Sequence, residues 1–214
     1  MQELSRRERE KLNRYNEILN AARKVFAEKG YEVATMDDVA SAAELSKGTI
    51  YLYFQNKSDL FASTLEMAME QVAYLIAESI SKNPDDFILG IKDIIQQQLL
   101  FCEKNMDLFK ILASDSFHIE IHSHMGKNKE SKLRLEKTMY ENMKLLADYI
   151  QLGIDRNVFK NVNPIDAAFA LLSLIQGFVF GWIMHPEDTR LKDKTEIVTT
   201  IFLDGLRSTD FLES

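Results

Sequence analysis

The 214-residue chain contains one cysteine, three prolines and eight glycines. The single Cys102 excludes an intrachain disulfide and is typical of a protein kept in a reducing cytoplasm. So few prolines and glycines disfavour long loops and sheets of many strands, while the content of Glu, Lys, Leu, Ala and Ile favours helices. The composition therefore predicts an all-α protein.

We also expect no segment that directs the chain to a membrane. Residues 1–17 are charged and no apolar segment follows them, so we expect no signal peptide. Residues 167–184 are almost entirely apolar, but 18 residues are barely enough to cross a bilayer, and acidic rather than basic residues flank them. A helix buried in a protein interface explains this run better, and we expect a cytoplasmic protein with no membrane partner.

The net charge of −7 is not shared by the N-terminal part of the chain. Residues 1–60 hold 10 of the 26 basic and 10 of the 33 acidic residues, so the excess of acid belongs to the remainder. Five cations gather at the start of the chain: Arg6, Arg7, Arg9, Lys11 and Arg14. Because the distribution of charge matters more than its total, the acidic balance does not exclude binding of nucleic acid by the N-terminal part.

Helical periodicity divides the first 60 residues into short helices. An apolar stripe predicts a helix over about residues 10–29, followed by Gly30 in a left-handed conformation. Thr35 and Ser46 have hydroxyls suited to cap two further helices, over about 35–43 and 46–54, and Asn56 caps a fourth. Three short helices leading into a longer one predict an N-terminal domain of residues 1–60 and a second domain of residues 61–214.

The expected helices of the second domain are longer. They cover about residues 84–102, 105–113, 127–155, 163–184 and 191–208. The least regular segment, residues 114–126, contains His118, His122 and His124 close to Glu120. Two histidines four residues apart can chelate a metal on a helix, but no further anchored ligand accompanies them, so we predict neither a metal site nor a cofactor.

Two short helices joined by a tight turn at residues 44–45 predict a helix-turn-helix, whose second helix can enter a DNA major groove. That helix begins with Ser46, Lys47, Gly48 and Thr49. Hydroxyls and free amides favour phosphate, lysine reaches a phosphate or a guanine edge, and glycine permits close approach. A helical bundle with polar surface residues explains the same pattern, so these residues alone leave both interpretations open.

Many positions between about Ile18 and Phe61 match one family at fixed spacing. They are Ala21, Ala22, Phe26, Gly30, Tyr31, Thr35, Val39, Ala40, Ser46, Lys47, Gly48, Thr49, Ile50, Tyr51, Tyr53, Phe54, Lys57 and Leu60. In these residues the chain resembles the DNA-binding domain of the tetracycline-repressor-like (TetR) family of regulators. The resemblance implies a DNA-facing set: Thr35, Ser46, Lys47, Gly48, Thr49, Tyr51, Tyr53 and Lys57.

One departure from the family pattern lies in the turn, where the family usually has glycine and this chain has Glu44. A residue with a β-carbon is tolerable there if the backbone stays out of the left-handed region.

Residues 61–214 carry no comparable signature, and the resemblance implies an all-helical effector-binding and dimerisation domain. The run 167–184 is apolar nearly all round, so this helix must be buried on more than one side. A core within one chain explains that burial, but a homodimer that matches two DNA half-sites is favoured. The expected dimer interface is Phe169, Leu172, Ile175, Gln176, Gly177, Phe180, Gly181, Ile197, Ile201 and Phe202.

Eleven of the 13 phenylalanines and seven of the nine methionines follow residue 60. Taken singly, each is better explained as core. Taken together, they predict an apolar cavity for a hydrophobic or amphipathic small-molecule effector, which would favour a dimer that no longer fits its operator. The expected lining is Phe87, Ile91, Phe109, Phe117, Met139, Tyr140, Met143 and Trp182.

Two other classes of function fit the sequence less well. An enzyme is disfavoured because the sequence has no nucleophile elbow, phosphate-binding glycine loop or metalloprotease helix motif. A helical ligand-binding module without operator affinity would not need the Ser46–Thr49 segment. We therefore predict a ligand-responsive DNA-binding transcriptional regulator that is not an enzyme. We expect repression, which is the common mode in the family. The effector would release the regulator from a palindromic operator.

Overall fold

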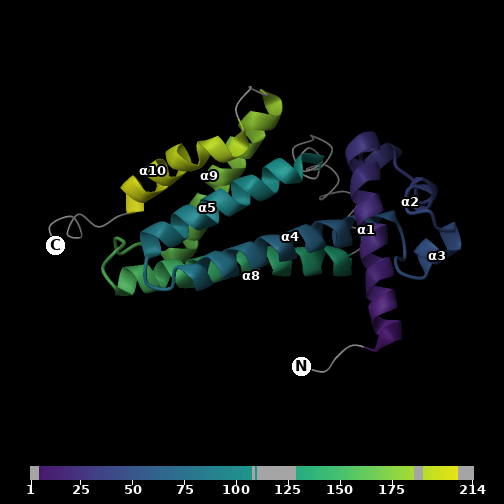
Figure 1. The fold of residues 1–214 in the computed structure, drawn as a ribbon, viewed down its shortest axis with the longest axis horizontal. Helices are drawn as coiled ribbons and strands as arrows, with labels where there is room; N and C mark the ends of the chain where they lie inside the picture. The colour runs from purple at the N-terminus through teal and green to yellow at the C-terminus, as the bar shows by residue number, and fades with distance from the viewer. Residues whose placement is uncertain (1–4, 108, 110–128, 186–189, 207–214) are drawn as a thin grey trace. The chain divides into compact units, whose positions relative to one another are not determined.

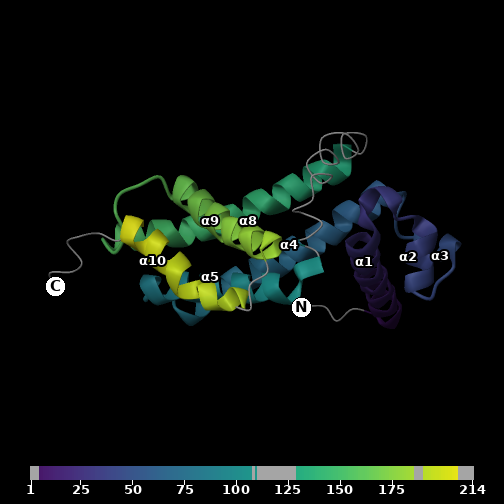
Figure 2. The ribbon, with the colours of Figure 1, turned by 90° about the horizontal axis from the view of Figure 1, so that it is seen from above.

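All the regular secondary structure described by the computed structural model is helical, as the composition predicts (Figure 1 and Figure 2). The described residues are 5–107, 109, 129–185 and 190–206. They form two compact units, the first from the described residues of Met1–Ala68 and Lys110–Glu136, the second from those of Met69–Phe109 and Lys137–Ser214. The domain boundary predicted after residue 60 falls inside helix α4 (Lys57–Lys82), and the division into 1–60 and 61–214 stays a prediction.

The first unit begins with α1 (Arg6–Val33), which starts earlier than its apolar stripe predicts. A capping box at Ser5 begins this helix. The Ser5 hydroxyl accepts the amide N–H of Glu8 at 3.3 Å, and the Glu8 carboxylate accepts that of Ser5 at 2.8 Å. Helices α2 (Met36–Ala42) and α3 (Lys47–Tyr51) follow, and then the first part of α4.

Gly30 divides α1 into two helical segments. Its φ of 74° has the positive sign that was predicted, but its ψ of 161° is extended rather than left-handed helical. Only glycine adopts this backbone region without strain. A β-carbon at Gly30 would meet no other atom within 4 Å, so glycine is needed here for its backbone freedom and not for space.

Aromatic rings close the core of the first unit. The ring of Phe26 lies edge-on to that of Phe61 with centroids 5.2 Å apart, and the ring of Tyr31 lies 4.7 Å from that of Phe61. Tyr15 stacks on Phe54 at 5.0 Å. These contacts join α1 to α4 and to the segment after α3. They therefore hold in place the residues that precede and follow α3.

The side chain of Lys57 joins the end of α1 to the start of α4. Its ammonium donates hydrogen bonds to the backbone carbonyl oxygens of Tyr31, Glu32 and Ala34 at 2.7, 3.1 and 3.0 Å. It also lies 4.5 Å from the centroid of the Tyr31 ring. Three carbonyl acceptors match the three ammonium protons, and the ring adds a cation–π contact. We call this arrangement the Lys57 clamp.

The second unit takes the rest of α4 and the part of α8 that follows residue 136. Helix α9 (Pro164–Met184) begins where the sequence predicts. The Asn163 side chain accepts the amide N–H groups of Ile165 and Asp166, and a proline occupies the first helical position. The helix predicted over 105–113 falls mostly outside the described residues. The other elements are α5 (Phe87–Lys104), α8 (Lys129–Asp155), the 3₁₀ helix η2 (Leu191–Lys194) and α10 (Thr195–Leu206).

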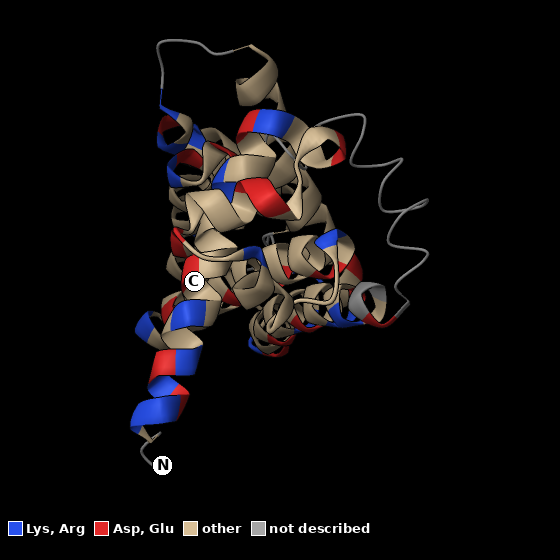
Figure 3. Ribbon diagram, turned by 90° about the vertical axis from the view of Figure 1, so that its right-hand side faces the viewer, with Lys and Arg blue, Asp and Glu red and all other residues tan. Residues whose placement is uncertain are grey.

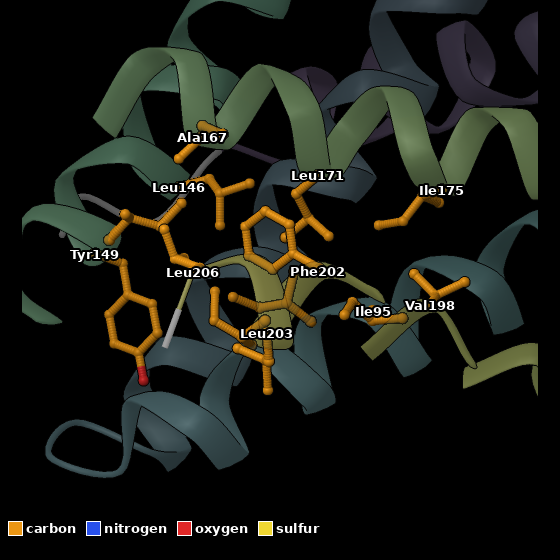
Figure 4. Packing of buried hydrophobic residues seen from close by; sticks show 14 of the residues in the cluster. Ile95, Leu146, Tyr149, Ala167, Leu171, Ile175, Val198, Phe202, Leu203 and Leu206 are labelled. Atoms are coloured by element: carbon orange, nitrogen blue, oxygen red, sulfur yellow. The ribbon is translucent and has the colours of Figure 1, made fainter. Parts of the chain in front are cut away.

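The core of the second unit is formed by residues of α5, α8, α9 and α10 (Figure 4). The ring of Phe202 from α10 lies beside Leu171 of α9. Tyr149 of α8 is buried and donates its hydroxyl to the carbonyl oxygen of Asn83 at 2.6 Å, and its burial raises the pKa of Tyr149 to about 12. A β-carbon on Gly90 would collide with this hydroxyl, so α5 needs a glycine where it packs against Tyr149.

Glu44, in the turn between α2 and α3, has a φ of 56°. The condition under which a β-carbon was expected to be tolerable, a backbone outside the left-handed region, is therefore not met. The amide N–H groups of Glu44 and Leu45 donate to the carbonyl oxygens of Ser41 and Ala40 at 3.1 and 2.9 Å. These bonds hold the turn in a conformation that costs a residue with a β-carbon about 1–2 kcal/mol.

Replacing Glu44 by glycine should therefore stabilise the first unit relative to replacement by alanine. Both changes remove the carboxylate, but only glycine relieves the positive φ, and the greater freedom of glycine in the unfolded chain offsets part of the gain. We expect the free energy of unfolding of Glu44→Gly to exceed that of Glu44→Ala by about 0.5–1 kcal/mol. Urea unfolding followed by circular dichroism measures this difference, and equal stabilities would contradict strain at the turn.

Candidate nucleic-acid interface

Helices α2 and α3 form the predicted helix-turn-helix in the first unit (Figure 1). Thr35 and Asp38 build a capping box at the start of α2, in which the Thr35 hydroxyl accepts the Asp38 amide N–H at 3.1 Å and donates to its carboxylate at 2.8 Å. The Asp38 carboxylate also accepts the Lys29 ammonium at 2.6 Å. The hydrogen bonds from Lys29 and Thr35 lower the pKa of Asp38 to about 2, so this cap stays charged at neutral pH.

The N-terminus of α3 presents small polar groups to solvent. The Ser46 hydroxyl caps the helix by accepting the amide N–H of Thr49 at 3.1 Å, and it lies 2.8 Å from the Thr49 hydroxyl. Gly48 is exposed, and the nearest neighbour of a β-carbon placed there would be the Ser46 Oγ at 3.8 Å. The backbone at Gly48 is therefore open enough for the close approach of another molecule.

Lys47 is the cation at this end of α3. Its ammonium pairs with the carboxylate of Asp37 from α2 at 2.8 Å, although the two side chains are 53% and 63% exposed. The hydrogen bond to Asp37 and the charge of that carboxylate raise the pKa of Lys47. Exposed ion pairs contribute little to stability, so a phosphate or a guanine edge is able to displace Asp37 from this lysine.

The two predicted tyrosines lie in different surroundings. Tyr51, at the end of α3, is 47% exposed, whereas Tyr53 is half-buried and lines a polar cavity of about 240 Å³. In that cavity the Arg134 guanidinium donates to the carboxylates of Asp59 and Glu66 at 3.2 and 3.1 Å. Tyr51 is therefore free to reach a ligand outside the protein, and Tyr53 borders a network of charged groups.

The structure brings together only part of the predicted DNA-facing set. Residues 46–51 lie on α3 or at its cap, and Tyr53 lies two residues past the end of α3. Thr35 is hydrogen-bonded to Asp38 at the start of α2, and the ammonium of Lys57 is bonded inside its clamp. Sequence reasoning missed Asp37, the partner of Lys47, and Leu52, which is 81% exposed. Leu52 follows Gly48 by four residues, so helical spacing was a signal that could have found it.

The residues predicted to line an effector cavity have unlike positions in the structure. Two are buried in the core of the second unit, Phe87 and Ile91. Three are half-buried and pack against that core, Phe109, Met143 and Trp182. Two are more than half exposed, Met139 and Tyr140, and Phe117 lies outside the described residues. Their role as a common lining stays a prediction.

A broad apolar face is exposed on α9 and α10. Among the described helices, α9 is long and apolar enough to cross a membrane. Only 22% of its most apolar stretch is buried within the chain, so most of that stretch is not covered by other parts of the same chain. Of the predicted dimer interface, Ile175 and Phe202 are buried in the core of this unit and Leu172 is half-buried. The members that remain exposed are Phe169, Gln176, Gly177, Phe180, Gly181, Ile197 and Ile201.

Other candidate chemistry receives no support from the described residues. Cys102 is buried, and burial raises the pKa of its thiol to about 12, so it is protonated at neutral pH, unlike a catalytic thiolate. His118, His122 and His124, with Glu120, lie outside the described residues. Within the part of the chain that is described, no group of three His, Cys, Asp or Glu side chains is placed to hold a metal ion.

Comparison with known proteins covers both parts of the chain. Residues 18–64 match the sequence model of the bacterial regulatory proteins of the tetR family. The fatty acid metabolism regulator protein of Bacillus subtilis is 26% identical over 206 residues, which are 94% of this chain and 99% of that protein. The transcriptional regulator AcrR of Shigella flexneri is 24% identical over 193 residues, which are 87% of this chain and 86% of that protein.

Solved structures show the same fold. The regulator FadR from Bacillus subtilis, in complex with stearoyl-CoA, superimposes with a TM-score of 0.76 at 22% identity, over 89% of this chain and 98% of that chain. The helix-turn-helix geometry, the match over residues 18–64 and the resemblance along nearly the whole length agree with one another. The chain belongs to the TetR family of bacterial transcriptional regulators.

Proposed function

We propose that this regulator binds a palindromic DNA operator as a homodimer, represses transcription from it, and is released by an amphipathic effector. The observation that carries the DNA-binding part is the exposed start of α3, where Lys47 and Gly48 stand between two hydroxyl residues. A helical ligand-binding protein without operator affinity would have no use for this arrangement. A cytoplasmic location follows from the function, because the operator is there.

In the proposed complex, α3 lies in the major groove and Lys47 exchanges Asp37 for a guanine edge or a phosphate. Gly48 lets the backbone come close to the DNA, and Leu52 offers an apolar contact to a base methyl group on the same side of the helix. Thr35 acts indirectly by fixing the start of α2. The side chains expected to contact DNA directly are Ser46, Lys47, Thr49, Tyr51 and Tyr53.

The exposed face of α9 and α10 supports the dimer. Phe169, Gln176 and Phe180 lie seven and four residues apart, so they share one side of α9, and Gly177 and Gly181 leave its backbone open to close approach. A contiguous apolar face exposed to water is unfavourable and is typical of a protein interface. A second copy of the chain, related by a two-fold axis, would cover it and present two reading helices to two half-sites.

The effector we propose is a long-chain acyl thioester. Its support is the resemblance over nearly the whole chain to a fatty acid metabolism regulator, and the fold shared with a FadR that binds stearoyl-CoA. Such a ligand is amphipathic, as the Phe- and Met-rich second unit predicts. It would act by binding more tightly to a dimer whose reading helices do not fit the operator, which shifts the population away from DNA.

Selection from a random DNA pool with the purified chain should enrich one short palindrome. A fluorescent duplex carrying that palindrome then tests the effector, and we expect a saturating concentration of stearoyl-CoA to weaken operator binding about tenfold or more, since allosteric couplings of 1–3 kcal/mol correspond to about 5–150-fold. Free coenzyme A is the control and should have no effect. A pool without enriched sequence would refute operator binding, and an operator complex indifferent to stearoyl-CoA would refute only the effector.

The dimer is tested by placing a charge on the exposed face. Phe180→Glu should weaken self-association at least about tenfold in sedimentation velocity, because each copy then loses a buried aromatic group and buries a carboxylate. Leu89→Glu is the matched control, since Leu89 is 49% exposed on α5 and Phe180 is 48% exposed on α9. The interface is misplaced if the two variants associate equally well.

The Lys57 clamp predicts that this lysine positions the reading unit and does not contact phosphate. Lys57→Met leaves three carbonyl oxygens without their donor, so the free energy of unfolding should fall by about 1–3 kcal/mol, while Lys24→Met on the exposed side of α1 should change it by less than about 0.5 kcal/mol. Measured where all three proteins are folded, the salt dependence of operator binding should equal that of the unchanged chain. A loss of about 0.9 in the slope would instead make Lys57 a phosphate contact.

A further inference from the structure

The first turns of α1 carry cations that the proposed reading surface does not use. The family match starts at residue 18, whereas α1 starts at Arg6, and residues 5–14 are all exposed. The helical segment ahead of the match spans about 18 Å. Figure 3 shows Lys and Arg recurring along it, with acidic residues between them.

Helical spacing places three of these cations on the side of α1 that is buried further along. Residues eleven apart are separated by close to three full turns, so they point in nearly the same direction. Arg7, Lys11 and Arg14 lie eleven residues before Ile18, Ala22 and Val25, which are 0%, 0% and 5% exposed. We call Arg7, Lys11 and Arg14 the basic stripe.

Tyr15 shows what this side of α1 faces. It follows Lys11 by one turn, and its ring stacks on that of Phe54, three residues after the end of α3. The basic stripe therefore continues the side of α1 that packs against the segment following the reading helix. Because nothing buries residues 5–14, the stripe extends that side into solvent.

The charges of the stripe are also available to a ligand. Within the described residues, Arg7 and Lys11 form no ion pair, and Arg14 is 45% exposed although it pairs with Glu17 at 2.8 Å. Arg6, about a quarter of a turn from Arg7, differs, since its guanidinium is paired with the Glu10 carboxylate at 2.8 Å. Arg7 and Lys11 therefore carry charge that no described carboxylate neutralises, on the side of α1 that packs against the segment after α3.

We propose that the basic stripe binds the DNA phosphate backbone flanking the half-site that α3 reads. This inference rests on the proposed operator binding and adds a second contact surface to it. Regularly spaced cations along about 10 Å of helix complement a strand that carries one phosphate for every 3.4 Å of duplex. The stripe would raise affinity for any sequence in the flank, because phosphate contacts carry no base information.

The experiment compares two double variants that remove equal charge from the same helical turns. Arg7→Gln with Lys11→Gln removes two members of the stripe. Arg6→Gln with Arg9→Gln removes two cations outside it, Arg9 on the opposite side of the helix and Arg6 about a quarter of a turn from Arg7. Glutamine keeps good helix propensity, and far-ultraviolet circular dichroism checks that both variants retain their helix. The full chain is titrated against the selected operator with flanks of about ten base pairs, at several salt concentrations.

For the stripe variant we expect affinity at 0.1 M salt to fall about tenfold or more and the magnitude of the salt slope to fall by about 1.8 per chain, since each phosphate contact contributes about 0.9. The Arg6 and Arg9 double variant should keep the slope of the unchanged chain. Trimming the flanks should weaken binding of the unchanged chain and leave the stripe variant unaffected.

Equal effects of the two variants would overturn the proposal, because they would show a general field of charge and no oriented contact. A stripe variant that binds like the unchanged chain would also overturn it while leaving operator binding intact. Failure of the unchanged chain to bind any selected DNA would overturn both the stripe and the proposed function.

Discussion

The placement of the reading helix depends on how the end of α1 is held. The chain leaves helical geometry at Gly30, and Lys57 supplies three hydrogen bonds from another helix to the backbone carbonyl groups that follow. Because Thr35, the N-cap of α2, follows directly, the same bonds determine where α2 begins. The turn at Glu44 then fixes where α3 begins relative to α2. Three features therefore set the geometry of the helix-turn-helix. They are the backbone conformation at Gly30, the backbone conformation at Glu44 and the ammonium of Lys57.

Features that depend on neighbouring residues could be predicted from the sequence. The caps at Thr35, Ser46 and Asn163 and the positive φ of Gly30 follow from local hydrogen bonding and backbone freedom, and the structure confirms them. The Lys57 clamp could not be predicted, because it joins residues 23–26 positions apart and a lysine at a helix start suits a phosphate equally well. The ring of Phe26 against Phe61 likewise follows from tertiary packing alone.

Whether an apolar side chain is buried or exposed is harder to predict from the sequence. Phe87 and Tyr140 look alike as candidates for a cavity lining, yet one is 3% and the other 56% exposed, since burial depends on which side of each helix meets a neighbour. Helix α9 is apolar nearly all round, so periodicity could not separate Ile175, which packs inward, from Phe180, which does not. The existence of an exposed apolar face was therefore predictable, but its composition required the packing of α5 and α10 against α9.

The burial of Cys102 has a consequence for how this protein can be studied. It is the only cysteine in the sequence, and with a thiol pKa of about 12 it supplies almost no thiolate for reagents that modify cysteine at neutral pH. A cysteine introduced at an exposed position, such as that of Leu52, would be the one readily labelled group without removal of the native thiol. In the proposed dimer, spin labels attached there would report the separation of the two α3 helices directly, with and without the proposed effector.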